Sequence, residues 1–166
     1  MHTQIAIDGP VASGKTVVGK ILSDQLGWRF LDTGLMYRAI TWMALNEQID
    51  ASNHIALENL ALNSQIELIA SSEGDRLFVN QNDITDDLRS RSIEATVSFI
   101  SQISGVRTAL IVKQREIASS GSIVMVGRDI GTRVLKYAGI KVFLTASTNE
   151  RAKRRLSQAL EINPDI

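Results

Sequence analysis

The sequence contains no cysteine, only two prolines and few aromatic residues, which make up 5% of its 166 residues. Without cysteine, neither disulfides nor thiolate metal sites can form, and the composition fits a reducing compartment. Eighteen basic residues balance eighteen acidic ones, so no net field attracts nucleic acid or a membrane surface. No segment approaches the roughly 20 consecutive apolar residues of a membrane span, and the N-terminus lacks the pattern of a secretory leader. We therefore expect a cytoplasmic monomer without nucleic-acid or membrane partners.

Four short apolar runs separated by helical patterns predict an α/β fold with a parallel sheet. A strand, a glycine-rich turn and a helix open the chain, and a second short strand follows, which is an order typical of parallel strands. The expected strands are Ile5–Ile7, Trp28–Leu31, Ile123–Val126 and Ile140–Leu144. On the first helix, the spacing places Val17, Val18, Ile21, Leu22 and Leu26 on one apolar side. At 166 residues the chain fits one domain with a sizeable core.

Between residues 65 and 85 the pattern changes from helical periodicity to alternation. The segments IELIA and RLFVN alternate apolar and polar residues, and the polar turn SSEGD lies between them. Together with NDIT they predict an antiparallel hairpin or a three-stranded ribbon. Helices are expected around it, at Met36–Asn46, near Leu57–Ala61, at Ile93–Ala118 with a break near Ser104, and at Thr148–Leu160.

The segment Gly9 to Thr16, GPVASGKT, has the spacing G-x-x-x-x-G-K-[ST] of a phosphate-binding P-loop. It lies between a predicted strand and a predicted helix, which is the context that this motif requires. Glycine lets backbone N–H groups turn toward a phosphate, the helix N-terminus adds partial positive charge, and Lys15 supplies a cation. The hydroxyl of Thr16 can bind Mg²⁺. An ordinary glycine-rich turn would not require this order of elements, so we predict nucleotide binding.

Polar residues follow the second and third predicted core strands as well as the first. Asp32-Thr33-Gly34 with Tyr37-Arg38 follows the second strand, and Arg128-Asp129 follows the third. Because ligands bind outside the carboxyl ends of parallel strands, we expect these residues to face one crevice. The planar guanidinium of an arginine can donate two hydrogen bonds to one phosphate, which suits a second phosphate group held for transfer.

Each polar residue also has a structural interpretation that the sequence leaves open. Asp32 can cap the helix after it or orient a Mg²⁺-bound water, and both roles can coexist. Arg38 and Arg107 lie in helical segments where a solvated or salt-bridged arginine is ordinary. His2 and His54 have no carboxylates at metal-ligand spacing, and no role is assigned to them. The basic group near the start of the last helix is either a charged face or a contact with a donor nucleotide, and it consists of Arg151, Lys153, Arg154 and Arg155.

Five segments together resemble the bacterial cytidylate kinase family, in order and at its spacing: IAIDGPVASGKT, LDTGLMYRAIT, VSFISQISGVR, GRDIGTRVL and IKVFLTASTNERAKRR. Many kinases and ATPases share the P-loop alone, whereas the DTGxMYRAxT and GRDIGT patterns are much more specific. The resemblance covers residues 3 to about 160. It implies a P-loop three-layer α/β/α fold with a core at residues 1–61 and 99–166 and a small antiparallel monophosphate-binding insert at 62–98.

By that resemblance the protein is an enzyme that transfers the γ-phosphoryl group of ATP to CMP or dCMP, with Mg²⁺ as cofactor. The implied catalytic residues are Lys15, which would hold donor phosphates, and Arg38 and Arg128, which would hold the acceptor phosphate. Mg²⁺ would bind Thr16 and, through water, Asp32. The implied ATP-binding residues are Gly9, Pro10, Val11, Ala12, Ser13, Gly14, Lys15, Thr16, Val17, Arg151, Arg154 and Arg155. The implied CMP-binding residues are Thr33, Tyr37, Arg38, Ser98, Arg107, Arg128 and Asp129, of which Ser98, Arg107 and Asp129 match positions that recognise cytosine.

The chain departs from the family pattern at three points. The family has Thr two positions after the P-loop lysine, where this chain has Val17, and Asp just before Gly127, where this chain has Val126. The sequence also ends where the family continues into an arginine-rich lid and a last strand and helix, so we expect these to be absent. A lid arginine of that kind can contribute about 10³ to 10⁵ in rate. A second interpretation therefore stays open, a truncated or catalytically impaired nucleotide-binding module of the same fold.

Overall fold

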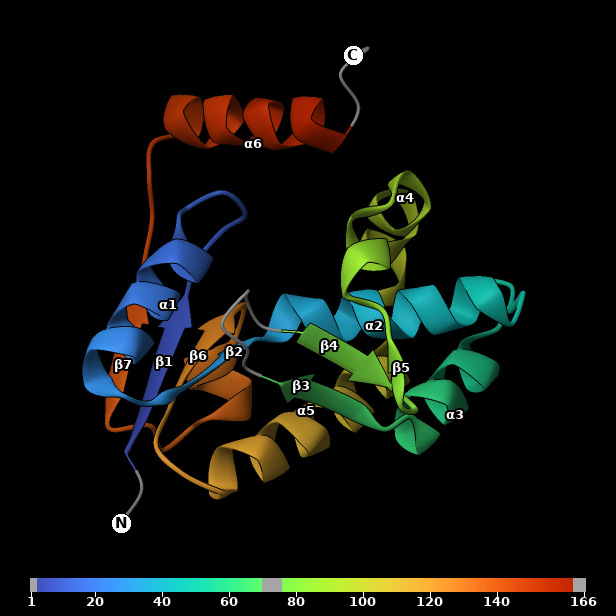
Figure 1. Cartoon of the computed structure of the whole chain (residues 1–166), viewed down its shortest axis with the longest axis horizontal. Helices are drawn as coiled ribbons and strands as arrows, with labels where there is room; N and C mark the ends of the chain where they lie inside the picture. The colour runs from blue at the N-terminus through green and yellow to red at the C-terminus, as the bar shows by residue number, and fades with distance from the viewer. Residues whose placement is uncertain (1–2, 70–75, 163–166) are drawn as a thin grey trace. The chain divides into compact units, whose positions relative to one another are not determined.

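The computed structural model describes residues 3–69 and 76–162, and these cluster into two compact units (Figure 1). The first unit contains the chain up to Thr33 and again from Lys113 onward, and the second contains Gly34–Val112. Two helices cross this division. Helix α2 (Thr33–Asn46) begins with the last residue of that first stretch, and α5 (Ser104–Ser119) begins in the second unit and ends in the first.

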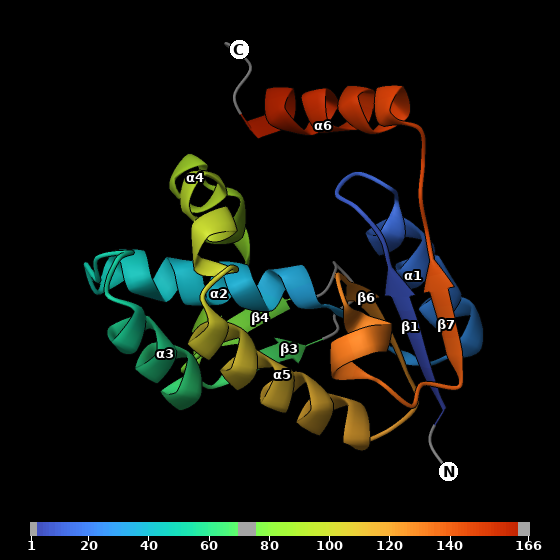
Figure 2. The ribbon, with the colours of Figure 1, turned by 180° about the vertical axis from the view of Figure 1, so that it is seen from behind.

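A four-stranded parallel sheet forms the centre of the first unit, in the order β2-β6-β1-β7 (Figures 1 and 2). Ile5 pairs with Val124 on one side and with Ile140 on the other. Because all pairs are parallel, β1, β2 and β6 end at the same edge of the sheet. The predicted α/β class with a parallel sheet is confirmed. The strands are β1 (Gln4–Asp8), β2 (Arg29–Asp32), β6 (Ile123–Gly127) and β7 (Ile140–Phe143).

Helix α1 (Lys15–Leu26) lies on one face of this sheet, and the residues that it buries are not those of the apolar side found from the spacing (Figures 1 and 2). Its buried residues are Gly19 and Ser23. A Cβ atom at Gly19 would lie 2.5 Å from Val126 Cγ1 and 2.9 Å from Phe30 Cε2. The helix therefore approaches the sheet through a glycine, which leaves most of the predicted apolar side in solvent. The residues concerned, Val17, Val18, Ile21 and Leu26, are 64%, 45%, 53% and 41% exposed.

The second unit combines helices with a three-stranded antiparallel sheet in the order β3-β4-β5. The strands are β3 (Ile66–Ile69), β4 (Arg76–Val79) and β5 (Asn82–Asp83), which confirms the predicted antiparallel ribbon. The predicted turn SSEGD lies outside the described residues. Besides α2 and the first part of α5, the helices are α3 (His54–Asn63), the 3-10 helix η1 (Thr85–Arg89) and α4 (Arg91–Ile100).

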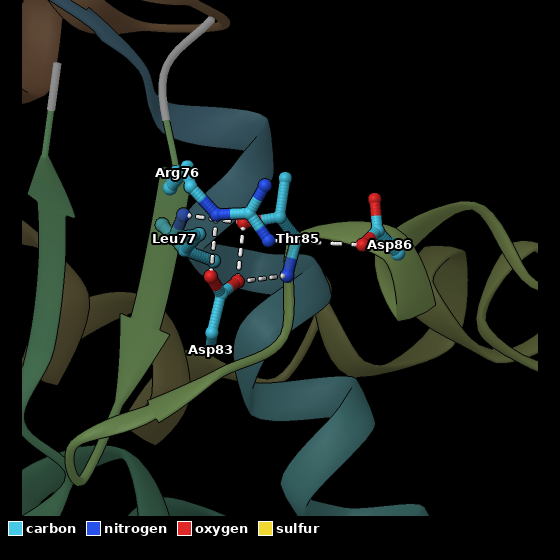
Figure 3. A network of polar contacts seen from close by, with 5 residues as sticks. All are labelled: Arg76, Leu77, Asp83, Thr85 and Asp86. Atoms are coloured by element: carbon cyan, nitrogen blue, oxygen red, sulfur yellow. Dashed lines mark hydrogen bonds and ion pairs between the residues drawn. The ribbon is translucent and has the colours of Figure 1, made fainter. Parts of the chain in front are cut away.

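A network of polar contacts joins β4, β5 and η1 in the second unit (Figure 3). Arg76 Nε donates to Asp83 Oδ2 at 2.5 Å. The other carboxylate oxygen of Asp83 accepts the hydroxyl of Thr85 at 2.7 Å and its backbone N–H at 3.0 Å. These bonds, the one from Arg76 first, lower the pKa of Asp83 to about 2. One carboxylate therefore ties the end of the small sheet to the helix that follows.

In residues 3–69 and 76–162, no single helix is long and apolar enough to cross a membrane. Helices α4 and α5 meet the length and composition requirement only as a pair bent by 97°. The same residues contain no group of three or more His, Cys, Asp or Glu side chains that could hold a metal ion.

Candidate active site

The P-loop connects the end of β1 to the start of α1, and two glycines set its path. Gly9 and Gly14 have φ angles of 154° and 98°, which residues with a side chain rarely adopt. A Cβ atom at Gly9 would overlap the carbonyl oxygen of Leu144, so only glycine fits there. Helix α1 begins directly after Gly14, and its first N–H groups carry partial positive charge. The loop therefore has the backbone geometry of an anion-binding site.

The ammonium group of Lys15 lies within this loop. Its Nζ donates to the carbonyl oxygen of Pro10 at 2.7 Å. Burial is the main influence on this group and lowers the pKa of Lys15 from its usual 10.5. The carboxylates of Asp32 and Asp8 oppose the shift, and the positive charge of Arg128 adds to it. Lys15 thus lies among charged residues at the carboxyl ends of three of the four core strands.

Thr16 and Asp32 form the oxygen pair of the site. The hydroxyl of Thr16 donates to Asp32 Oδ2 at 2.6 Å. Asp32 is the last residue of β2, and Thr16 is the second residue of α1. Two oxygen donors of this kind suit Mg²⁺, which prefers hard oxygen ligands and keeps several waters. The two side chains are thus adjacent, and their role toward Mg²⁺ stays a prediction.

Asp8 connects the P-loop to the segment that carries Arg128. Its two carboxylate oxygens accept the backbone N–H groups of Ile130 at 2.6 Å and Gly131 at 2.8 Å. These residues open η2 (Ile130–Val134), a short π-helix that the sequence did not predict. Asp129, just before η2, has a φ of 54° in the left-handed region. The carboxylate therefore fixes a strained turn at the place where Arg128 and Asp129 leave β6.

Arg115 of α5 holds the other end of η2. Its Nη2 donates to the carbonyl oxygen of Arg133 at 2.6 Å and its Nε to that of Val134 at 3.0 Å. The GRDIGT segment is thus held from both ends, while the side chain of Arg128 itself is exposed. A fixed backbone with an exposed guanidinium suits a residue that binds a ligand.

An open hollow of about 570 Å³ lies beside the P-loop in the first unit. Both the start of the P-loop and the Arg128-Asp129 pair contribute to its wall, together with residues at the end of β7. Its lining residues are Asp8, Gly9, Pro10, Val11, Arg128, Asp129, Phe143 and Thr145. The hollow therefore combines two of the three polar segments that the sequence predicted at strand ends, and Asp32-Thr33-Gly34 is not part of its lining.

Among the basic residues of α6 (Thr148–Ile162), Arg154 contacts the P-loop. Its Nη1 donates to the carbonyl oxygens of Ala12 at 3.4 Å and Ser13 at 3.3 Å. Three buried polar atoms in this unit have no hydrogen-bond partner among the described residues: Ser13 Oγ, Gln114 Nε2 and Arg151 Nε. Arg155 is exposed. The side chain of Arg154 therefore lies against the P-loop, and a contact of this basic group with a donor nucleotide stays a prediction.

The family model described as cytidylate kinase matches residues 5–164. The chain belongs to the cytidylate kinase family. It is 45% identical over 151 residues to the cytidylate kinase of Oceanobacillus iheyensis, covering 91% of this chain and 66% of that protein. It is 42% identical over 162 residues to the cytidylate kinase of Bacillus subtilis, covering 98% of this chain and 72% of the relative. The chain thus spans about two thirds of the length of these curated relatives, and the family predicted from its motifs is confirmed.

The CMP-binding residues implied by the cytidylate kinase pattern are divided between the two units. Thr33, Arg128 and Asp129 belong to the first unit. Thr33 is buried, and its hydroxyl donates to the carbonyl oxygen of Val126 at 3.0 Å. Its side chain therefore joins the ends of β2 and β6, just before Arg128.

The remaining members of this set, Tyr37, Arg38, Ser98 and Arg107, lie in the second unit. Arg38 is half-buried and donates to the carbonyl oxygen of Leu88 at 3.0 Å and to Glu94 Oε1 at 2.6 Å. Arg107 Nη1 donates to the carbonyl oxygen of Ser101 at 3.2 Å. Tyr37 is half-buried and Ser98 is exposed. The roles of these residues toward a nucleotide stay predictions.

The two sequence departures from the cytidylate kinase pattern occupy different environments. Val17 is 64% exposed on α1, so its side chain makes little contribution to packing. Val126 is fully buried in the sheet, in one cluster with Ile5, Ile7 and Val124. At the point where the family places a carboxylate, this chain therefore has an apolar core residue.

Three residues at these sites were not singled out from the sequence. Asp8 and Arg115 fix the GRDIGT segment, and Glu94 is paired with Arg38. Asp8 could have been suspected, because a carboxylate ends an otherwise apolar strand. Arg115 and Glu94 lie on helices among other charged residues, and no local pattern distinguishes them.

Proposed function

We propose that this chain transfers the γ-phosphoryl group of ATP to CMP or dCMP and forms CDP or dCDP. The carrying observation is the P-loop with Lys15 bonded inside it and the Thr16–Asp32 pair directly beside it. The relatives in the same family are named cytidylate kinases, which favours a cytidine monophosphate as acceptor.

The donor site is assigned to the P-loop. Its N–H groups and the ammonium of Lys15 would bind the phosphates of ATP, with Arg151, Arg154 and Arg155 contacting the nucleotide from α6. The oxygen pair of Thr16 and Asp32 fits Mg²⁺, with Asp32 acting through water. Bound there, Mg²⁺ would neutralise charge on the transferring phosphates. A phosphate would also supply a partner for the buried hydroxyl of Ser13.

The acceptor residues are assigned from the matching motifs. Arg38 and Arg128 would bind the acceptor phosphate through charge-assisted hydrogen bonds, which are the strong ones. Ser98, Arg107 and Asp129 would recognise cytosine, with Thr33 and Tyr37 beside them. We further propose that residues 62–98 form the monophosphate-binding insert, and that the protein acts as a cytoplasmic monomer on these small ligands alone.

Purified protein with ATP, Mg²⁺ and CMP should form CDP. Arg128→Ala should raise the KM for CMP by roughly 10- to 100-fold, since charge-assisted bonds of this kind contribute about 1.5 to 3 kcal/mol. Arg133→Ala is the matched control, because Arg133 is exposed in the same segment and contributes only backbone atoms to hydrogen bonds among the described residues. An unchanged KM for CMP in Arg128→Ala would refute that assignment.

Val126 favours a second candidate function, a nucleotide-binding module with little turnover. A buried valine cannot supply the carboxylate that supports Mg²⁺ elsewhere in the family. Calorimetry with ATP and CMP separates the two candidates, because binding of both without CDP formation indicates the module. Absence of heat for either ligand would refute both.

A further inference from the structure

Arg38 and Glu94 form a closely bonded ion pair between α2 and α4. Arg38 Nη2 lies 2.6 Å from Glu94 Oε1, and the two side chains are 23% and 17% exposed. At this burial a charge pair is screened less by water than a surface pair. Glu94 also lies in the first turn of α4, where the helix dipole favours a negative charge. The carboxylate is therefore a well-stabilised partner of this guanidinium.

Arg38 does not depend on Glu94 alone for its position. Its Nη1 donates to the carbonyl oxygen of Leu88 at 3.0 Å. Leu88 belongs to η1, which is held against α2 a second time, because Trp42 Nε1 donates to Asp87 Oδ2 at 2.9 Å. Arg38 and Trp42 lie four residues apart and therefore on the same side of α2. Without Glu94, the bond to Leu88 would still orient the guanidinium.

We propose that Glu94 competes with the acceptor phosphate for Arg38 and thereby sets the KM for CMP. This inference rests on the proposed function, in which Arg38 binds that phosphate. A carboxylate and a phosphate accept hydrogen bonds from the same N–H groups of a guanidinium. An arriving phosphate must displace Glu94 from Arg38 or bind beside a like charge. Both routes weaken binding, so the carboxylate lowers the affinity for the monophosphate.

The first test compares the full chain with Glu94→Gln and with Glu67→Gln, which removes a charge from an exposed position of β3 in the same unit. Glutamine keeps the size of the side chain and one acceptor oxygen but removes the competing charge. We expect Glu94→Gln to lower the KM for CMP about tenfold, as expected for a like charge close to the phosphate. The KM for ATP and kcat should change less than about twofold, and Glu67→Gln should change nothing. An unchanged or raised KM for CMP in Glu94→Gln overturns the proposal.

Two further variants separate competition from a positioning role. Glu94→Asp restores the charge and should return the KM for CMP toward that of the parent chain. In an Arg38→Met background, Glu94→Gln should no longer lower the KM, because the shared guanidinium is gone. A tenfold decrease that persists without Arg38 would show that Glu94 acts elsewhere.

Calorimetric titration of CMP distinguishes a failure of the competition proposal from a failure of the proposed kinase function. If the parent chain binds CMP but forms no CDP, the kinase function fails, and the Kd of Glu94→Gln still decides the competition. Tighter CMP binding by the variant supports the proposal, and equal or weaker binding overturns it. If the parent chain binds no CMP, both proposals are refuted.

Discussion

The carboxylate of Asp8 accepts the backbone N–H of Ile130 at 2.6 Å across 122 residues of sequence. Its second oxygen accepts the N–H of Gly131 at 2.8 Å. Asp8 also immediately precedes the P-loop, so one side chain couples the donor loop to the segment that carries Arg128. Both donors are backbone groups in a partly buried turn, and they depend on an anion at this position.

Asp8→Ala should therefore destabilise the first unit by about 2 to 4 kcal/mol, because it leaves two N–H groups without their charged acceptor. Asp8→Asn keeps one acceptor oxygen and should lose about half as much. Urea unfolding followed by circular dichroism measures both variants. A loss below about 0.5 kcal/mol for Asp8→Ala would contradict the coupling, since that is the range of ordinary surface substitutions.

Gly19→Ala tests the close approach of α1 to the sheet. The added Cβ would meet Val126 and Phe30 in a packed core, and overpacking of this kind costs about 1 to 3 kcal/mol. Helix propensity opposes this by at most about 1 kcal/mol, so we expect a net decrease in the melting temperature. Val17→Ala, at a 64% exposed position of the same helix, should leave the melting temperature nearly unchanged. A larger decrease in melting temperature for Val17→Ala than for Gly19→Ala would indicate that the apolar side with Val17, and not Gly19, packs on the sheet.

The features predicted correctly from the sequence depend on neighbouring residues. The P-loop is defined by a local spacing between a strand and a helix, and the core strands are contiguous apolar runs. The apolar spacing on α1 does not identify the side that packs on the sheet. Hydrophobic periodicity counts Val17 and ignores Gly19, whereas the close approach to the sheet leaves room only for a glycine at the contact. Side-chain size at a contact depends on the opposing surface, which no local pattern describes.

Polar contacts between residues far apart in the chain could not be predicted from the sequence either. For Arg38 the ordinary salt-bridged state was left open, and the structure shows that bond, but nothing in the spacing identified Glu94 as its partner. The π-helix η2 was missed for a related reason. Its bonds join residues five apart, as from the N–H of Leu135 to the carbonyl oxygen of Ile130, and its start is fixed by Asp8 from another strand. Hydrophobic periodicity carries no information about either.

Lys15→Met should weaken ATP binding without lowering the stability of the protein. Because burial lowers the pKa of Lys15, the folded state holds its proton less tightly than the unfolded state, and the charged lysine costs stability at neutral pH. That cost declines as the pH rises through the lowered pKa toward 10.5. We therefore expect Lys15→Met to melt at the same temperature as the parent chain or higher, while its affinity for ATP falls at least about 100-fold.

Lys136→Met serves as the control for Lys15→Met, since Lys136 is exposed and contributes only its carbonyl oxygen to a described contact. It should change neither the melting temperature nor ATP binding by calorimetry. A lower melting temperature together with preserved ATP affinity in Lys15→Met would show that the lysine is structural.

We expect the stability of the second unit to depend on pH through the carboxyl group of Asp83. Its pKa is about 2 in the folded protein, against an ordinary value of 3.8, chiefly because of the hydrogen bond from Arg76 (Figure 3). A carboxylate with a lowered pKa contributes stability that is fully present above the unfolded value and is lost as the pH falls through the folded one. Asp83→Asn should therefore lower the urea midpoint at neutral pH, and the difference from the parent chain should shrink between pH 3.8 and about 2.

Asp86 supplies the matched control for this titration. Its carboxylate lies 3.7 Å from the same guanidinium of Arg76, but its side chain is 91% exposed, so solvent screens the pair. Asp86→Asn should leave the urea midpoint unchanged at every pH in this range. Since both substitutions remove one charge near Arg76, a difference between them reports the hydrogen bonds of Asp83 rather than net charge. Two results would contradict a stabilising role of the Asp83 hydrogen bonds. One is an equal change in urea midpoint for both variants, and the other is a difference between Asp83→Asn and the parent chain that stays constant down to pH 2.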